Sequence, residues 1–151
     1  MNKSTFTAVL LALSQPCFAG SSDAFVAEVG NWKVIKTVDS FSGEFECVGH
    51  YKHNIRTYLR KDNLTMLTTG QYTLEDVTIR YGEEPPRRTR KATDLETRFG
   101  VVTLKGKEFS ELMKHSRVRT RVLLFRSSTD EDVNLTGIQD AVKIMMNGCK
   151  L

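Results

Sequence analysis

Residues 117–125 read RVRTRVLLF, which is the clearest β-strand pattern in the chain. Basic side chains alternate with apolar or hydroxyl side chains at first, and the segment then becomes wholly apolar. A period of two puts Val118 and Val122 on a buried face and the basic residues on the opposite face. The basic residues of this row are Arg117, Arg119 and Arg121. The segment therefore predicts one strand of a half-buried sheet.

Short β-branched segments extend this pattern toward the N-terminus. Strands are expected at 31–38, 45–51, 64–69 and 77–81, and one or two more within 95–104. Turn-forming residues over 39–44 predict a hairpin between the first two strands. Residues 20–30 are expected to form a flexible arm, with a short first strand as the alternative.

Two short helices are expected in the C-terminal third of the chain. Phe109 and Leu112 give residues 107–115 one apolar stripe. Thr136, with Gln139 three residues later, has the spacing of a capping box and predicts the start of the second helix. The apolar stripe of this second helix consists of Ile138, Ala141, Val142, Met145 and Cys149.

The composition suits one globular domain. The chain has 151 residues, of which 40% are hydrophobic and 26% are charged. We therefore expect a single domain over 31–151, mainly β and antiparallel, sandwich- or barrel-like, with an α+β fold as the alternative. The net charge of +4 is too small to indicate a nucleic-acid-binding protein.

Residues 1–19 have the organisation of a secretory signal peptide. Lys3 precedes an apolar run over 6–13, and Cys17 and Ala19 place small residues before the expected cleavage site after Ala19. The apolar run is short for a spanning helix, which needs about 20 residues. A retained anchor and a lipoprotein acylated at Cys17 are the alternatives. Cleavage would leave 132 residues, without a transmembrane segment and with a net charge of +3.

Cleavage would also leave one pair of cysteines, Cys47 and Cys149. An even number of cysteines in an exported chain predicts a structural disulfide. In the chain-entropy model, closing so long a loop stabilises the fold by about 4–5 kcal/mol. Catalytic or metal-binding thiols are the alternative, although the chain has no CxxC spacing to support them.

No segment of the sequence has a recognisable catalytic or metal-binding motif. Cys47, His50 and His53 form a C-x2-H-x2-H pattern, but a strand would point His50 away from the other two. We therefore expect surface histidines, no metal and no cofactor. No G-x-S-x-G or S-x-x-K motif is present, and the adjacent acids Glu83 and Glu84 precede two prolines as in a solvated turn. We expect no catalytic residue, and a paired-carboxylate glycosidase is kept as an alternative.

Two basic clusters are the candidate binding residues. The row on the 117–125 strand is one, and the second contains Arg87, Arg88, Arg90 and Lys91. One interpretation is a charged strand face that protects a sheet edge from aggregation. The other is an anion-binding surface, since arginine forms bidentate contacts with carboxylates and phosphates. Partners would then be an envelope protein or an anionic envelope component rather than nucleic acid.

The order of several short motifs resembles known periplasmic proteins. The motifs are Trp32–Val34, Cys47, Val77–Arg80, the helix with Phe109 and Leu112, and the closing helix within Val133–Val142 that precedes the last cysteine. This order is similar to small bacterial periplasmic proteins of the invasion-associated locus B type and to accessory periplasmic proteins of type VI secretion. The resemblance implies a β-sandwich-like envelope protein without a known catalytic centre.

Three functions are expected from these patterns. The first is a periplasmic or secreted, non-enzymatic binding or accessory protein of the bacterial envelope, held together by a disulfide. The second is a protein inhibitor of an envelope or host enzyme, with the stiff loop over 82–86 as its inserting element. The third is a small hydrolase acting on cell-wall or lipid material.

Overall fold

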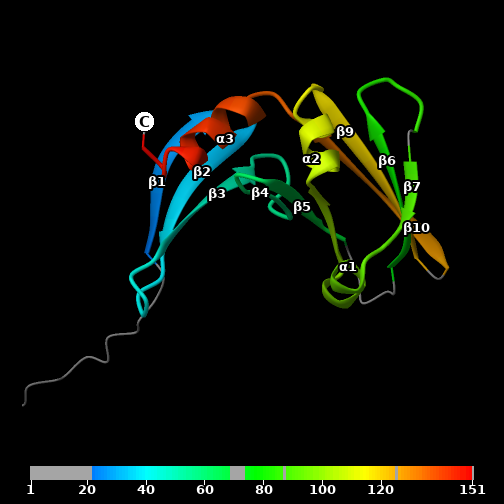
Figure 1. Ribbon diagram of the computed structural model, residues 1–151, viewed down its shortest axis with the longest axis horizontal. Coiled ribbons are helices and arrows are strands. Elements are labelled where there is room, and N and C mark those ends of the chain that lie inside the picture. The colour runs from blue at the N-terminus through cyan, green and yellow to red at the C-terminus, as the bar shows by residue number, and fades with distance from the viewer. Residues whose placement is uncertain (1–21, 69–73, 87, 125, 151) are drawn as a thin grey trace, which may run out of the picture.

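The computed structural model describes residues 22–68, 74–86, 88–124 and 126–150. The expected signal peptide over 1–19 lies outside these residues. The fold is mainly β, as expected, and consists of two antiparallel sheets with three short helices (Figure 1). Among the described residues, none of the helices has the length and hydropathy needed to cross a bilayer.

The larger sheet has six strands in the order β1-β2-β3-β4-β5-β8. Its strands are β1 (Ser22–Val29), β2 (Trp32–Val38), β3 (Phe45–Tyr51), β4 (Thr57–Leu59), β5 (Asn63–Leu67) and β8 (Val101–Lys105). The expected hairpin joins β2 to β3, with Val34 opposite Gly49. The expected flexible arm over 20–30 is wrong from residue 22 onward. That segment forms the short first strand given as the alternative, which pairs along β2 at the edge of the sheet.

The smaller sheet has four strands in the order β10-β9-β6-β7. Its strands are β10 (Ser127–Asn134), β9 (Arg117–Leu124), β6 (Leu74–Tyr81) and β7 (Arg88–Lys91). The strand predicted over 117–125 is β9, and Val118 and Val122 are fully buried as its alternation indicates. Thr120 lies on the same face, and its hydroxyl is 3.8 Å from the sulfur of Met66 in the larger sheet, so the two sheets meet there.

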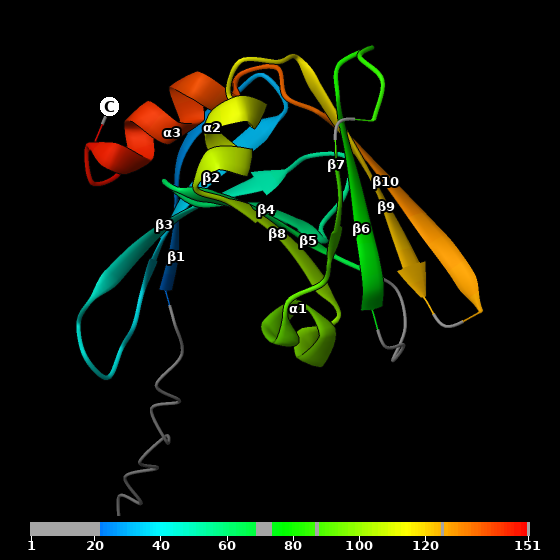
Figure 2. The same ribbon diagram turned by 45° about the vertical axis from the view of Figure 1, so that its right-hand side comes forward.

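The three helices pack against the two sheets. They are α1 (Asp94–Phe99), α2 (Lys107–Leu112) and α3 (Ile138–Met146). α3 lies over β1, β2 and β3, as both views show (Figure 1, Figure 2), and its predicted apolar stripe is buried from Ile138 to Met145. The strands expected within 95–104 are partly wrong, since α1 precedes β8. Thr93 and Glu96 form a capping box there, and Gly100 ends the helix at a φ of 63°.

The start of α3 differs from the expected capping box. Gly137, not Thr136, is the N-cap residue, and the hydroxyl of Thr136 donates instead to Asn134 Oδ1 at 2.7 Å. The amide of Gln139 donates to the carbonyl oxygen of Met113 at 2.9 Å. The helix therefore begins where the chain crosses the β1–β2 turn. At this point the backbone contact with the turn, and not a side-chain cap, fixes the start of the helix.

Gly30 and Gly137 make this crossing possible. Both have positive φ values, of 55° and 84°, and the N–H of Asn31 donates to Thr136 O at 2.9 Å. A Cβ atom on Gly30 would overlap the backbone of residue 136, and one on Gly137 would overlap the carbonyl of Val29. Only two glycines allow the backbones to approach this closely.

Gly137→Ala is therefore expected to lower the free energy of unfolding by about 2–4 kcal/mol, from overpacking plus backbone strain. Gly43→Ala is the matched control, because Gly43 also has a positive φ (72°) but open space around it. That control should cost about 1 kcal/mol. Urea unfolding of both variants measures the difference, and equal losses would contradict a close crossing.

Candidate binding surfaces

The predicted arginine row lies on the outer face of the smaller sheet, next to a row of acids on the neighbouring strand, β10. Arg117 Nε donates to Asp132 Oδ1 at 2.7 Å, and Arg121 Nε donates to Asp130 Oδ1 at 2.8 Å. These bonds raise the pKa of both arginines and lower the pKa of both aspartates. β10, which provides the acids, pairs along the full length of β9. Positive and negative side chains are therefore paired on this face, and the arginines do not leave an excess of positive charge there.

The central arginine of the row holds the loop that follows β6. Arg119 Nη2 donates to Gly82 O and to Glu83 Oε2, both at 3.1 Å. Arg80 donates to the carbonyl oxygens of Glu83 and Glu84 at 3.1 and 2.7 Å. Two guanidinium groups thus fix the backbone of this turn. A hollow of about 310 Å³ lies beside it on the outer face, lined in part by Pro86.

In the second basic cluster, the two side chains that the structure describes, Arg90 and Lys91, do not join this row. Arg87 lies outside the described residues, and only the backbone of Arg88 is described, in β7. Lys91 forms an ion pair with Asp76 at 2.9 Å on the outer face. Arg90 points to the opposite, inner face, because it pairs in register with the buried Val77. The predicted arginines whose side chains the structure describes therefore occupy both faces of one sheet and form no single basic surface.

Arg90 clamps two acids between the sheets. Its Nη1 and Nη2 atoms donate to the two carboxylate oxygens of Glu96 at 2.7 and 2.8 Å, and its Nε donates to Glu108 at 2.8 Å. Glu96 also accepts from the backbone N–H groups of Thr93 and Thr103. Burial opposes ionisation of Glu96, which is only 3% exposed, but these hydrogen bonds outweigh it and lower the pKa of Glu96 to about 2. Arg90 therefore has a structural role.

The histidines are dispersed and do not meet Cys47. His50 contacts the ring of Tyr58 edge-on on the outer face of the larger sheet, and partial burial lowers its pKa. His53 lies 3.3 Å from Asn31 Oδ1, while His115 stacks on Tyr81. In the ranges that the structure describes, no three metal-ligating side chains come together.

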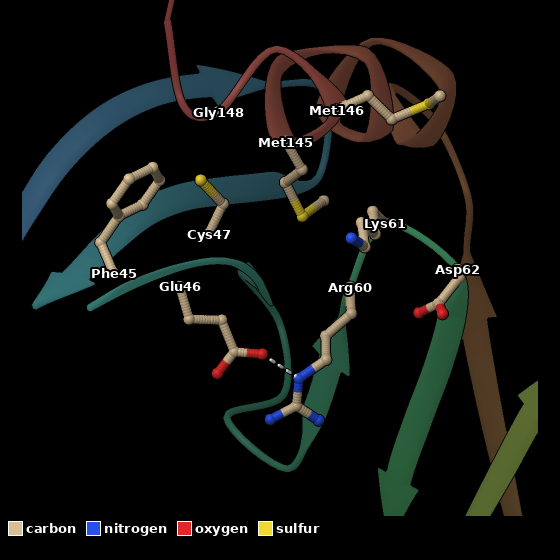
Figure 3. Close-up of a pocket in the computed structure, with 9 residues that line it drawn as sticks. All are labelled: Phe45, Glu46, Cys47, Arg60, Lys61, Asp62, Met145, Met146 and Gly148. Carbon is tan, nitrogen blue, oxygen red and sulfur yellow. Dashed lines mark hydrogen bonds and ion pairs between the residues drawn. The ribbon is translucent and has the colours of Figure 1, made fainter. Parts of the chain in front are cut away.

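A pocket of about 370 Å³ opens between α3, β3 and the β4–β5 turn (Figure 3). Met145, which is only 4% exposed, lies beside Cys47 at its apolar end, as Figure 3 shows. Phe45 and Met146 border the same opening and are 51% and 71% exposed. The pocket is lined by Phe45, Glu46, Cys47, Arg60, Lys61, Asp62, Met145, Met146 and Gly148. Large apolar side chains that face solvent around a hollow are typical of binding surfaces.

Charged groups surround this apolar centre. Arg60 Nε donates to Glu46 Oε1 at 2.5 Å, across the side of the pocket opposite Met145 (Figure 3). Lys36 Nζ lies 4.0 Å from the centre of the Phe45 ring, in a cation–π contact. The pocket thus combines an adaptable, sulfur-rich floor with a charged rim. Sequence reasoning missed this site, because its residues come from three segments that meet only in the folded chain.

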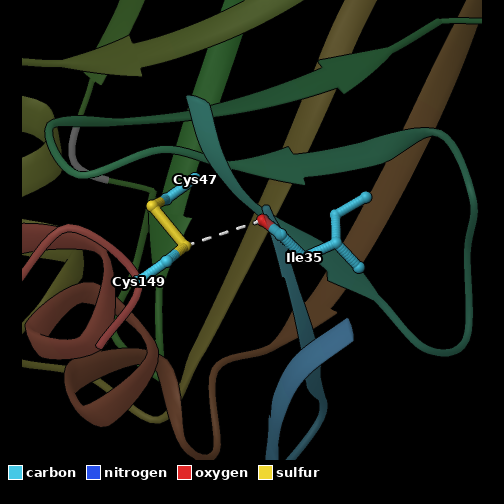
Figure 4. Close-up of a disulfide and its surroundings, with 3 residues drawn as sticks. All are labelled: Ile35, Cys47 and Cys149. Atoms are coloured by element: carbon cyan, nitrogen blue, oxygen red, sulfur yellow. Dashed lines mark hydrogen bonds between the residues drawn. A yellow bond between two sulfur atoms is a disulfide. The ribbon is translucent and has the colours of Figure 1, made fainter. Parts of the chain in front are cut away.

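The predicted disulfide joins Cys47, which lines this pocket, to Cys149 (Figure 4). The two Cα atoms are 5.9 Å apart, within the usual range for a disulfide. Cys149 lies three residues beyond the end of α3 rather than within it, and its φ is 59°. Its sulfur also lies 3.8 Å from the carbonyl oxygen of Ile35 in β2. The bond therefore ties the segment after the last helix to the centre of the larger sheet.

No protein family, curated protein or solved structure matches this chain in sequence or fold. The resemblance to periplasmic proteins of the invasion-associated locus B type and of type VI secretion stays a prediction.

Proposed function

We propose that this protein is an exported, non-enzymatic binding protein of the bacterial envelope, and that it docks another envelope component at the pocket beside Cys47–Cys149. The observation that carries the proposal is the exposure of Phe45 and Met146 around the buried Met145. Exposed aromatic and methionine side chains next to a hollow form anchors in protein and ligand interfaces.

Export is the second part of the proposal. Its support is the disulfide, since disulfides persist in oxidising compartments, together with the signal-peptide pattern over 1–19. The disulfide also keeps the pocket wall in place, so a binding surface there would be rigid before it meets its partner. Pre-organised surfaces lose less entropy on binding.

Site-specific photo-crosslinking tests the docking site. A photoreactive amino acid at position 146 is expected to yield covalent adducts when the protein is incubated with envelope extract. The matched control carries the same group at Ile55, which is 82% exposed elsewhere on the molecule. A third variant carries it at Arg121. Equal adducts at 55 and 146 would contradict the proposal, and adducts at position 121 alone would move the site to the arginine row.

The loop over 82–86 supports a second candidate, a protein inhibitor of an envelope or host enzyme. Its backbone is held by Arg80 and Arg119, so it could enter a cleft without being ordered first. Inhibition assays against muramidases and proteases distinguish this function from simple docking. The hydrolase hypothesis stays a prediction.

A further inference from the structure

A third hollow, a groove of about 550 Å³, lies between α1 and the outer face of β5 and β8. Thr65, Val101 and Thr103 share that face by register and line the groove. Leu95 and Phe99 line it from α1 and are 61% and 64% exposed. Two large apolar side chains therefore face solvent beside a floor that contains two hydroxyl groups.

The groove borders the free edge of the larger sheet, and this edge is blocked at its centre. β8 is the last strand of the sheet. The N–H of Thr103 donates to Glu96 Oε1 at 2.9 Å, and Arg90 Nη2 donates to Thr103 O at 3.4 Å. Because both backbone groups are occupied, a peptide strand cannot pair with β8 at this point. A ligand in the groove must therefore be recognised by side chains.

The charged side chains that line the groove are Arg60, Arg90, Lys105, Glu96 and Glu108, and their formal net charge is +1. Arg90 holds both acids that line the groove, Glu96 and Glu108. Arg60 lines one end and is paired with an acid outside the groove. Lys105 also lines the groove, and its exposed side-chain ammonium has no hydrogen bond or ion pair with any residue in the described part of the chain. An anionic group would therefore find an ammonium group that makes no ion pair, next to an apolar wall.

We propose that this groove binds an anionic single-chain lipid. Its alkyl chain lies against Leu95 and Phe99, and its head group lies at Lys105 and Arg60. The apolar wall accounts for the chain, and the free lysine accounts for the anionic head. The blocked strand edge disfavours an extended peptide as the occupant. This site adjoins the proposed docking pocket at Arg60, which lines both, whereas Leu95, Phe99 and Lys105 line only the groove.

Titration with sodium laurate below its micelle threshold tests this proposal, monitored by amide chemical shifts and by calorimetry. Laurate is expected to shift amide signals over 95–105. Dodecyl maltoside has an alkyl chain of nearly the same length with an uncharged head, and acetate has the head without the chain, so both should bind more weakly. Equal affinity for laurate and dodecyl maltoside, or laurate shifts confined to other surfaces, would overturn the proposal.

Two pairs of variants locate the contacts. Phe99→Ser should weaken laurate binding about tenfold, and Lys105→Gln about threefold, as expected for an exposed charge pair. The matched controls are Phe41→Ser, in the β2–β3 turn at 98% exposure, and Lys107→Gln, an exposed lysine that does not line the groove. All four positions have side chains outside the core, so folding is preserved. Controls that weaken binding as much as the groove variants would count against the site.

Discussion

Replacing both Cys47 and Cys149 by serine is expected to lower the free energy of unfolding by about 4–5 kcal/mol, one of the two largest effects expected for this protein. The bond closes a loop with a sequence separation of 102 residues, so its loss gives the unfolded chain much more conformational freedom. The folded chain also loses the tie between β3 and the segment after α3. Urea unfolding at neutral pH measures the change.

The reduced wild-type protein is the matched control for this variant. It should unfold at the same urea concentration as the double serine variant, and well below the oxidised protein. Mass measurement after alkylation without reductant should find no free thiol on Cys47 or Cys149. Two alkylated thiols, or unchanged unfolding on reduction, would contradict a structural disulfide.

Glu96→Gln is expected to lower the free energy of unfolding by about 3 kcal/mol, because it leaves the guanidinium of Arg90 short of a buried counter-charge. The glutamine cannot accept both Arg90 donors and both backbone N–H groups as the carboxylate does. Asp94→Asn is the matched control. It removes an exposed acid from the same helix turn and should cost only a few tenths of a kcal/mol. Equal losses would contradict the clamp.

The same clamp predicts how stability depends on pH. The pKa of Glu96 falls from an ordinary value of 4.5 to about 2 in the folded protein. A group with a lowered folded pKa stabilises the protein fully above its unfolded pKa. This contribution, about 3 kcal/mol, is lost as the pH falls from about 4.5 toward 2. Glu96→Gln should therefore show a flatter loss of stability over this interval, and parallel curves for variant and wild type would contradict it.

Several elements were predictable because their patterns are local. The alternation of Val118 and Val122 with the arginines predicted β9 and its buried face, and the stripe from Ile138 to Met145 predicted α3. The disulfide followed from counting the cysteines that remain after the expected signal peptide. The sequence also contains a capping box at Thr93 and Glu96, which marks the start of α1. Strands were expected there instead, because the residues that follow have a β-strand composition.

β10 could not be predicted, because its residues are almost all polar. Its segment reads SSTDEDVN, and only Val133 is buried. What stabilises it is the partner strand, which provides Arg117 and Arg121 opposite its aspartates. Such cross-strand pairs can stabilise a strand that has no apolar pattern of its own.

The sequence by itself determined the fold class, the cysteine pair and the faces of β9 and α3, because periodicity and residue counts do not depend on long-range distances. Only the tertiary structure decided which charges are free. Arg117, Arg119 and Arg121 are indistinguishable from an anion-binding row until β10 and Glu83 lie beside them. Arg90 proves to be a partly buried clamp on the buried Glu96. Charge interactions depend on the separation and burial of the groups, and folding sets both.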